Sequence, residues 1–344
     1  MLSRLRVRLL EFLGDQVIEL VDVGARGGVQ PHWQWLNQKL HLTMLEPDPS
    51  AAAKLISDNT NKGLKPMIIE TAVWNNCETH KLNITRSGGC SSLLEPNREL
   101  LSNFPNSERF SVVEKVKINT NTLDSVLDPK TKYDFLKIDA QGGSLMVLEG
   151  SERTLEKLLG LEVEAEFLEM YKGGSLFGEI HDFLSKNKFQ LVDFRPTYWQ
   201  RISGQNIPGC KGQMISSDML YLVSPENFAD RMENLSRNEI HETLGRLMIC
   251  CSVYGLEDWM VSYMSICFER NLIKKSDLLN QIDQKCRAGG IFSWLPKIPG
   301  QMGICMLLRD IAFHIDNNGK NWVYQDNTLG NMARTRWTKW MRNK

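Results

Sequence analysis

Asp22, Glu46 and Asp139 each lie at the end of a short apolar run of the kind that forms a buried β-strand. The first run is followed by the glycine-rich segment 24–28, which predicts a tight turn that brings backbone N–H groups close to a ligand. Because the carboxyl ends of parallel strands meet at one edge of a sheet, we expect the three acids to lie along that edge. The sequence therefore predicts a ligand site there.

The glycine turn distinguishes two classes of ligand. A dinucleotide-binding turn has the pattern G-x-G-x-x-G, but here the bulky Arg26 stands where the second glycine would let a pyrophosphate approach. Asp22, directly before the turn, would repel a pyrophosphate and suits a cationic group such as an ammonium or a sulfonium. Glu46 has the spacing of a ribose-binding acid, so a nicotinamide-dependent oxidoreductase remains the alternative.

The order of the apolar runs predicts the architecture that positions these acids. Strand and helix patterns alternate over residues 17–73, which indicates a parallel sheet with helices on both faces. Within this region we expect a helix through Trp33, Leu36 and Leu40, and a single strand over 67–73. The other main strands are expected at 41–47, 133–139, 161–167, 189–194 and 219–223, the last of them antiparallel.

The second part of the chain has a different pattern. Residues 225–344 show helical runs at 238–254, 258–270, 275–286 and 305–314. We therefore expect an α/β domain over 1–224, which begins with an amphipathic helix at 1–14, and an all-helical domain over 225–344. The helical domain could form an oligomer or shape the ligand site. The formal net charge is zero, so no nucleic-acid partner is expected.

The motifs, taken together and in this order, resemble the FkbM-type methyltransferases. They lie at 22–28, 45–49, 91–93, 136–142, 147–150 and 162–167. The resemblance covers about residues 15–224. It implies a Rossmann-like, seven-stranded class I methyltransferase sheet, S-adenosylmethionine as cofactor, and transfer of its methyl group, usually to a hydroxyl oxygen. This chain departs from the family pattern at Arg26, Gln141 and Ser144, where Asn, Glu and Glu are commoner.

The resemblance and the chemistry of the residues together assign roles. The expected cofactor contacts are Asp22, Gly24, Ala25, Arg26, Gly28, Glu46, Pro47, Asp48, Ala72 and Asp139. A hydroxyl is a poor nucleophile, so we expect a base, first Asp139 and second Glu164 or Glu166, which share one face of a strand. Ser91, Tyr171 and His32 are expected to face the acceptor. With no histidine near the acids in sequence, we expect no metal.

The resulting expectation is an S-adenosylmethionine-dependent O-methyltransferase of glycan biosynthesis or secondary metabolism, acting on a small-molecule or glycan hydroxyl. A second alternative is a scaffold that binds cofactor but methylates nothing, which Gln141 and Ser144 support. The eight cysteines lack metal spacing, and we find neither a membrane-spanning run nor a secretory signal, which predicts a cytoplasmic protein. Basic residues in 4–8 and in the Trp-containing tail 334–344 suit peripheral contact with the inner face of a membrane, and the alternative is a solvated helix end whose Trp residues pack on the helical domain.

Overall fold

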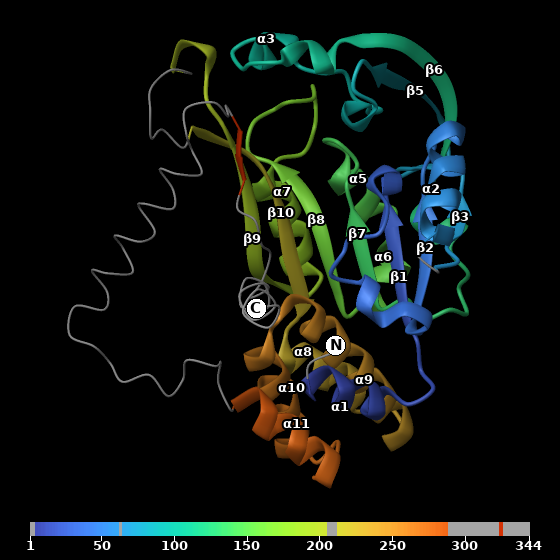
Figure 1. The fold of residues 1–344 in the computed structure, drawn as a ribbon, viewed down its shortest axis with the longest axis vertical. Helices are drawn as coiled ribbons and strands as arrows, with labels where there is room; N and C mark the ends of the chain where they lie inside the picture. The colour runs from blue at the N-terminus through green and yellow to red at the C-terminus, as the bar shows by residue number, and fades with distance from the viewer. Residues whose placement is uncertain (1–3, 62–63, 205–211, 288–322, 326–344) are drawn as a thin grey trace, which may run out of the picture.

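The fold is built on one large sheet, shown in Figure 1, whose strand order is β11-β9-β10-β8-β7-β1-β2-β3. The structure is a computed structural model, and it describes residues 4–61, 64–204, 212–287 and 323–325. Strands β8, β7, β1, β2 and β3 are parallel, and β10 runs antiparallel between β8 and β9. The expected seven-stranded class I methyltransferase sheet is therefore confirmed, and β11 (Val323–Gln325) adds an eighth strand along β9.

Helices and turns cover both faces of the central strands, so the apolar runs of these strands are buried. The seven strands are β1 (Ile18–Val23), β2 (Leu40–Leu45), β3 (Met67–Ile69), β7 (Phe135–Ile138), β8 (Gly160–Glu166), β9 (Phe189–Trp199) and β10 (Gln213–Val223). The flanking helices are α2 (Pro49–Asn61), α4 (Leu123–Val126), α5 (Ser144–Glu149), α6 (Glu152–Lys157) and α7 (Phe177–Lys186). As expected, β10 is antiparallel to its neighbours.

The segment after the glycine turn is not the α-helix that the sequence predicted. It forms two short 3-10 helices, η1 (Ala25–Gly27) and η2 (Gln34–Lys39). Asn37 interrupts η2 with φ 49° and ψ −118°, and β2 begins at Leu40, so no room remains for a regular helix. The apolar spacing that suggested a helix instead places Trp33 in the core, where its ring packs 5.0 Å from that of Phe135.

The expected strand over 67–73 is divided between two sheets. The N–H of Thr71 donates to the carbonyl of Ile69 at 2.9 Å, which turns the chain between β3 and β4 (Ala72–Val73). Strand β4 belongs to a second sheet of order β4-β6-β5, with β5 at Thr79–Thr85 and β6 at Val112–Asn121. Together with η3 (Gly88–Cys90), α3 (Arg98–Leu101) and η4 (Ser107–Phe110), this sheet stands above the carboxyl edge of the main sheet in Figure 1.

Five helices form a layer at the opposite end of the sheet, where β1 begins and β10 ends, as Figure 1 shows. They are α1 (Arg4–Leu13), α8 (Pro225–Met232), α9 (Arg237–Tyr254), α10 (Glu257–Glu269) and α11 (Asp277–Arg287). Their buried side chains continue the apolar core of the sheet, so the division at residue 224 stays a prediction. The expected helix 305–314 and the tail 334–344 lie outside the described residues. Across the described ranges, no helix has the length and hydropathy needed to cross a membrane.

Candidate functional site

A cavity of about 380 Å³ opens at the carboxyl edge of the main sheet. Its wall is formed by the turns that follow β1, β2 and β7, by β4, and by residues of the second sheet. Gly24, Glu46 and Asp139 stand on one side, and Ala72 and Ser91 belong to the other elements. The predicted ligand edge therefore contains a real cavity, and two of the three acids line it.

The glycine turn brings the end of β1 against the end of β7. Gly24 has φ 75°, and a Cβ atom added there would clash with the backbone carbonyl oxygen of Asp139. Gly28 has φ 71° and donates its N–H to the carbonyl of Ala25 at 2.8 Å. The glycine at position 24 is thus required by the close approach of two strands, which sets the position of Asp139 at the cavity.

Glu46 lies at the floor of the cavity and is only 4% exposed. Its Oε1 accepts a hydrogen bond from the N–H of Asp48 at 3.0 Å. Burial raises the pKa of Glu46, whereas the Asp48 N–H and the Arg26 guanidinium act in the opposite direction. A carboxylate held in this way can accept two hydrogen bonds from a vicinal diol.

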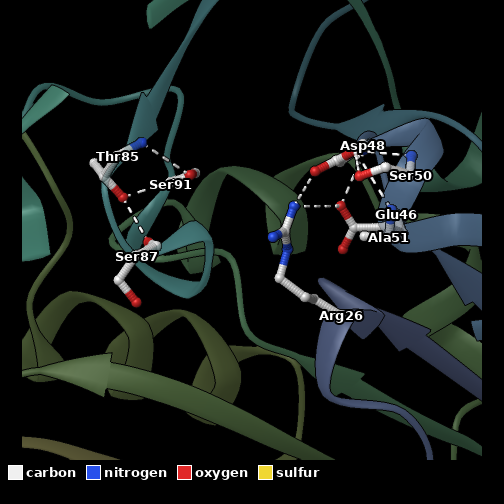
Figure 2. Close-up of polar contacts among 8 residues, drawn as sticks. All are labelled: Arg26, Glu46, Asp48, Ser50, Ala51, Thr85, Ser87 and Ser91. Atoms are coloured by element: carbon white, nitrogen blue, oxygen red, sulfur yellow. Dashed lines mark hydrogen bonds and ion pairs between the residues drawn. The ribbon is translucent and has the colours of Figure 1, made fainter. Parts of the chain in front are cut away.

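Arg26 reaches across the cavity from the glycine turn, as Figure 2 shows. Its Nη2 pairs with Asp48 and lies 3.9 Å from Oε1 of Glu46. The side chain also fills the space beside Gly88, where an added Cβ atom would clash with Nη1. The other carboxylate oxygen of Asp48 caps helix α2 by accepting the N–H of Ser50 at 2.9 Å. Arg26 therefore occupies the part of the cavity next to Glu46.

Three carboxyl groups gather where β7 and β8 end. Asp139 lines the cavity with its side chain 36% exposed, whereas Glu166 is 4% exposed. Burial raises the pKa of Glu164 well above its ordinary value, and the neighbouring Asp139 and Glu166 carboxyls act in the same direction. Burial also raises the pKa of Glu166, to about 8. Burial thus disfavours the charged form of Glu164 and Glu166, and Asp139 is the member that lines the cavity.

Asp22 faces away from the cavity and contacts a lysine that the sequence analysis did not single out. The parallel register sets Lys137 beside Asp22, and its Nζ lies 3.2 Å from Asp22 Oδ1 and 4.0 Å from Asp139 Oδ2. Asp22 is 2% exposed, and burial raises its pKa while Lys137 opposes that shift. In the sequence, Lys137 is a single lysine in an otherwise apolar strand that stands between two acids. Its pairing with Asp22 can be recognised only when the strand register is known.

Residues 22–191 match the family model described as the methyltransferase FkbM domain. They form an FkbM methyltransferase domain. The chain accordingly carries an S-adenosylmethionine-dependent methyltransferase domain. No curated protein matches the chain in sequence.

Solved structures that resemble the chain are distant from it. Magnesium protoporphyrin IX methyltransferase from Synechocystis, with bound S-adenosylmethionine, is 10% identical over 64% of this chain and 78% of its own, with a TM-score of 0.33. A putative tRNA methyltransferase from Streptococcus pneumoniae is 11% identical over 84% of this chain and 99% of its own, with a TM-score of 0.34. Precorrin-6y C5,15-methyltransferase from Geobacter metallireducens is 12% identical over 63% and 86%, with a TM-score of 0.33.

The structure brings together most of the residues expected to bind cofactor in the FkbM domain. The cavity is lined by Gly24, Arg26, Glu46, Pro47, Asp48, Ala72 and Asp139. Asp22, Ala25 and Gly28 lie outside this lining, and Ala25 is buried in the core. Their effect on a ligand would pass through the shape of the turn or through Lys137.

The three residues expected to face the acceptor in the FkbM domain lie in different parts of the structure. Ser91 lines the cavity. Tyr171 is 1% exposed, is not part of the lining, and contacts the lining residue Gln141 through its hydroxyl. His32 lies elsewhere, with its ring 5.1 Å from that of Tyr254, and burial lowers its pKa to about 3. His32 therefore packs beside Tyr254 and is not part of the cavity lining. Within the described part of the chain, no group of three or more His, Cys, Asp or Glu side chains could hold a metal ion.

Proposed function

We propose that the FkbM domain methylates a hydroxyl oxygen of a sugar, a glycan or a secondary metabolite, with Asp139 as the general base. The observation that carries this proposal is the position of Asp139, whose partly exposed carboxylate lines the cavity beside the glycine turn. Glu164 and Glu166 are weaker candidates for the base, because burial raises the pKa of each carboxyl, to about 8 for Glu166, and neither side chain lines the cavity.

The chemical character of the cavity fits S-adenosylmethionine. Glu46 would accept hydrogen bonds from the ribose hydroxyls, and the apolar wall of Ala72, Val73 and Trp74 would contact the adenine. The turn at Gly24 would border the methionine part. When bound, the cofactor supplies a methyl group already activated by its sulfonium charge. The protein's own task is then to orient the acceptor and to remove its proton.

Two titrations test the cofactor assignment against the nicotinamide alternative. Isothermal titration calorimetry should show that the protein binds S-adenosylhomocysteine and does not bind NAD. The reverse result would overturn the proposed function. In the same experiment Asp139→Asn should retain S-adenosylhomocysteine binding, with some loss of affinity, because the amide keeps the size of the side chain but not its charge.

Transfer of a labelled methyl group to a panel of sugars, glycans and phenols tests the rest. With an acceptor in hand, Asp139→Asn should lower the transfer rate by about 10² to 10⁴-fold, the contribution of a positioned base. A variant with undiminished transfer would show that Asp139 is not the base. Intact S-adenosylhomocysteine binding without transfer to any member of a broad panel would favour the non-catalytic scaffold.

Peripheral membrane contact stays a proposal that depends on the tail 334–344. Two of the three N-terminal arginines make contacts within the chain, since Arg6 stacks over the Trp35 ring at 4.4 Å and Arg8 pairs with Glu11 at 2.5 Å. Co-sedimentation with anionic vesicles should therefore decrease when the chain is truncated after residue 330. Equal sedimentation of the two proteins would exclude a role for the tail.

A further inference from the structure

We propose that Gln141 is a positioning residue that holds the Asp139 carboxylate in place to accept a proton, with Glu164 held beside it. The inference rests on the proposed function, since it concerns how the base is held. Gln141 follows β7 and belongs to the turn that carries Asp139, yet its side chain reaches the end of β8.

The contacts of Gln141 satisfy its whole side-chain amide. Nε2 donates to Asp139 Oδ1 at 2.8 Å and to Glu164 Oε2 at 2.8 Å, while Oε1 accepts from the Tyr171 hydroxyl at 2.8 Å. The Asp139 carboxylate can only accept hydrogen bonds, so the NH₂ group of Gln141 must face it, and the amide oxygen is left to accept from Tyr171. The amide orientation is therefore set by chemistry, and both N–H groups are used.

The surrounding backbone fixes Gln141 in a conformation that it would not adopt alone. Its φ is 47°, a left-handed value that residues other than glycine rarely take. The Ser92 hydroxyl donates to the Gln141 carbonyl at 2.7 Å, and Tyr171 packs against Gly142, where an added Cβ atom would lie 2.9 Å from the ring. Unusual backbone geometry held by three separate segments is typical of functional positions.

An amide is the side chain that suits this electrostatic environment. Lys137 donates to Asp22 at 3.2 Å and is farther from Asp139, at 4.0 Å, so its charge is shared. Gln141 donates a hydrogen bond to Asp139 and another to Glu164. It adds no charge to the cluster that these two carboxyls form with Glu166. A glutamate at this position would add a fourth acid and remove at least one donor, which favours protonation of its neighbours. The amide thus supplies a donor to both Asp139 and Glu164 without adding charge to the cluster.

The test follows the titration of Asp139 in the absence of cofactor, by ¹³C NMR of carboxyl-labelled protein, with Asp139→Asn used to assign the signal. In Gln141→Glu the Asp139 midpoint should rise by about one pH unit or more, because a like charge replaces a donor. In Gln141→Met, which removes the donors without adding charge, it should rise by less. Gln190→Glu is the matched control, since Gln190 is exposed on β9, and should leave the midpoint unchanged.

Tyr171→Phe offers a third variant, because it frees Gln141 Oε1 and should move the Asp139 midpoint in the same direction. If Gln141→Glu fails to fold, Gln141→Met and Tyr171→Phe still decide the question. Unchanged midpoints with lowered melting temperatures would overturn the proposal and leave Gln141 a structural residue. S-adenosylhomocysteine binding is measured separately, so loss of the proposed function would show as absent binding whatever the midpoints do.

Discussion

Under the proposed function, two groups compete for the carboxylate of Glu46. In the structure Arg26 lies 3.9 Å from its Oε1, and a bound ribose would need the same oxygens. The Arg26 side chain is 37% exposed, so water screens this ion pair and reduces its contribution to stability. Arg26 can therefore be displaced from Glu46 at little cost, and the two residues should have opposite effects on cofactor affinity.

Replacement of the carboxylate should weaken cofactor binding. In Glu46→Gln one ribose hydroxyl loses a charged acceptor, so the dissociation constant of S-adenosylhomocysteine should rise by about 10 to 100-fold. Isothermal titration measures this, and Glu70→Gln, an exposed glutamate just after β3, is the control. Equal affinity of the two variants would remove Glu46 from the cofactor site.

Removal of the competing cation should have the opposite effect. Arg26→Ala frees Glu46, so S-adenosylhomocysteine should bind more tightly by up to about fivefold, the scale of a partly exposed ion pair. The affinity of the variant should also depend less on salt than that of the natural chain. Weaker binding by Arg26→Ala would instead mean that Arg26 contacts the carboxylate of the ligand.

The glycine turn gives a prediction for a whole element, because Gly24 and Gly27 have different surroundings. Gly24→Ala places a methyl group against the Asp139 carbonyl in a left-handed conformation and should destabilise the protein by more than about 2 kcal/mol. Gly27→Ala meets nothing within 4 Å and should be nearly neutral. Urea unfolding compares the two variants, and similar losses would show that the turn relaxes around Gly24.

Sequence patterns predicted the central strands well, since β1, β2 and β7 are apolar runs that end close to an acid. They failed where tertiary contacts override local periodicity. Trp33 fits a helical spacing, yet it fills the core from an irregular segment broken at Asn37. The division of 67–73 depends on a pairing of β4 with β6, some fifty residues away, which no local pattern reports.

The candidate site could be predicted only as far as strand ends allow. Glu46 and Asp139 follow β2 and β7 directly, so the edge of the sheet had to bring them together. Asp22 is the second-last residue of β1 and does not follow the strand. It pairs with Lys137 in the sheet, and its side chain contacts that lysine. The contacts of Gln141 join two strand ends and a distant tyrosine, so only the folded arrangement shows them.

Across the whole molecule, a buried ion pair connects the helical layer to the sheet. Arg246 of α9 donates through Nε to Asp134 Oδ1 at 2.8 Å, directly before β7. Both side chains are buried, at 9% and 2% exposed. Burial raises the pKa of Asp134 to about 6, although Arg246 acts against that shift. The layer and the sheet should consequently unfold together.

Arg246→Met should test this connection, because it leaves Asp134 without its cation. We expect a loss of about 3 to 5 kcal/mol in the free energy of unfolding at pH 8. The pKa of Asp134 is higher in the folded state than in the unfolded one, so its contribution is most favourable at low pH and decreases as pH rises through about 6. The variant should therefore lose less at pH 5, where Asp134 takes up a proton.

Urea unfolding at both pH values measures the effect, and Arg270→Met is the control. Arg270 forms an exposed pair with Asp230, whose side chain is 60% exposed, so this variant should behave like the natural chain at either pH. A loss for Arg246→Met that does not change with pH would show that Asp134 is not the source of the penalty.

The position of the helical layer also has a practical consequence. Helix α1 packs on α9 and α11 at the end of the sheet where β1 begins, and the cavity opens at the end where β1 finishes. A protein attached to a solid support through its amino terminus would thus present the cavity to solution. Such a surface could capture ligands of the cavity directly from a mixture.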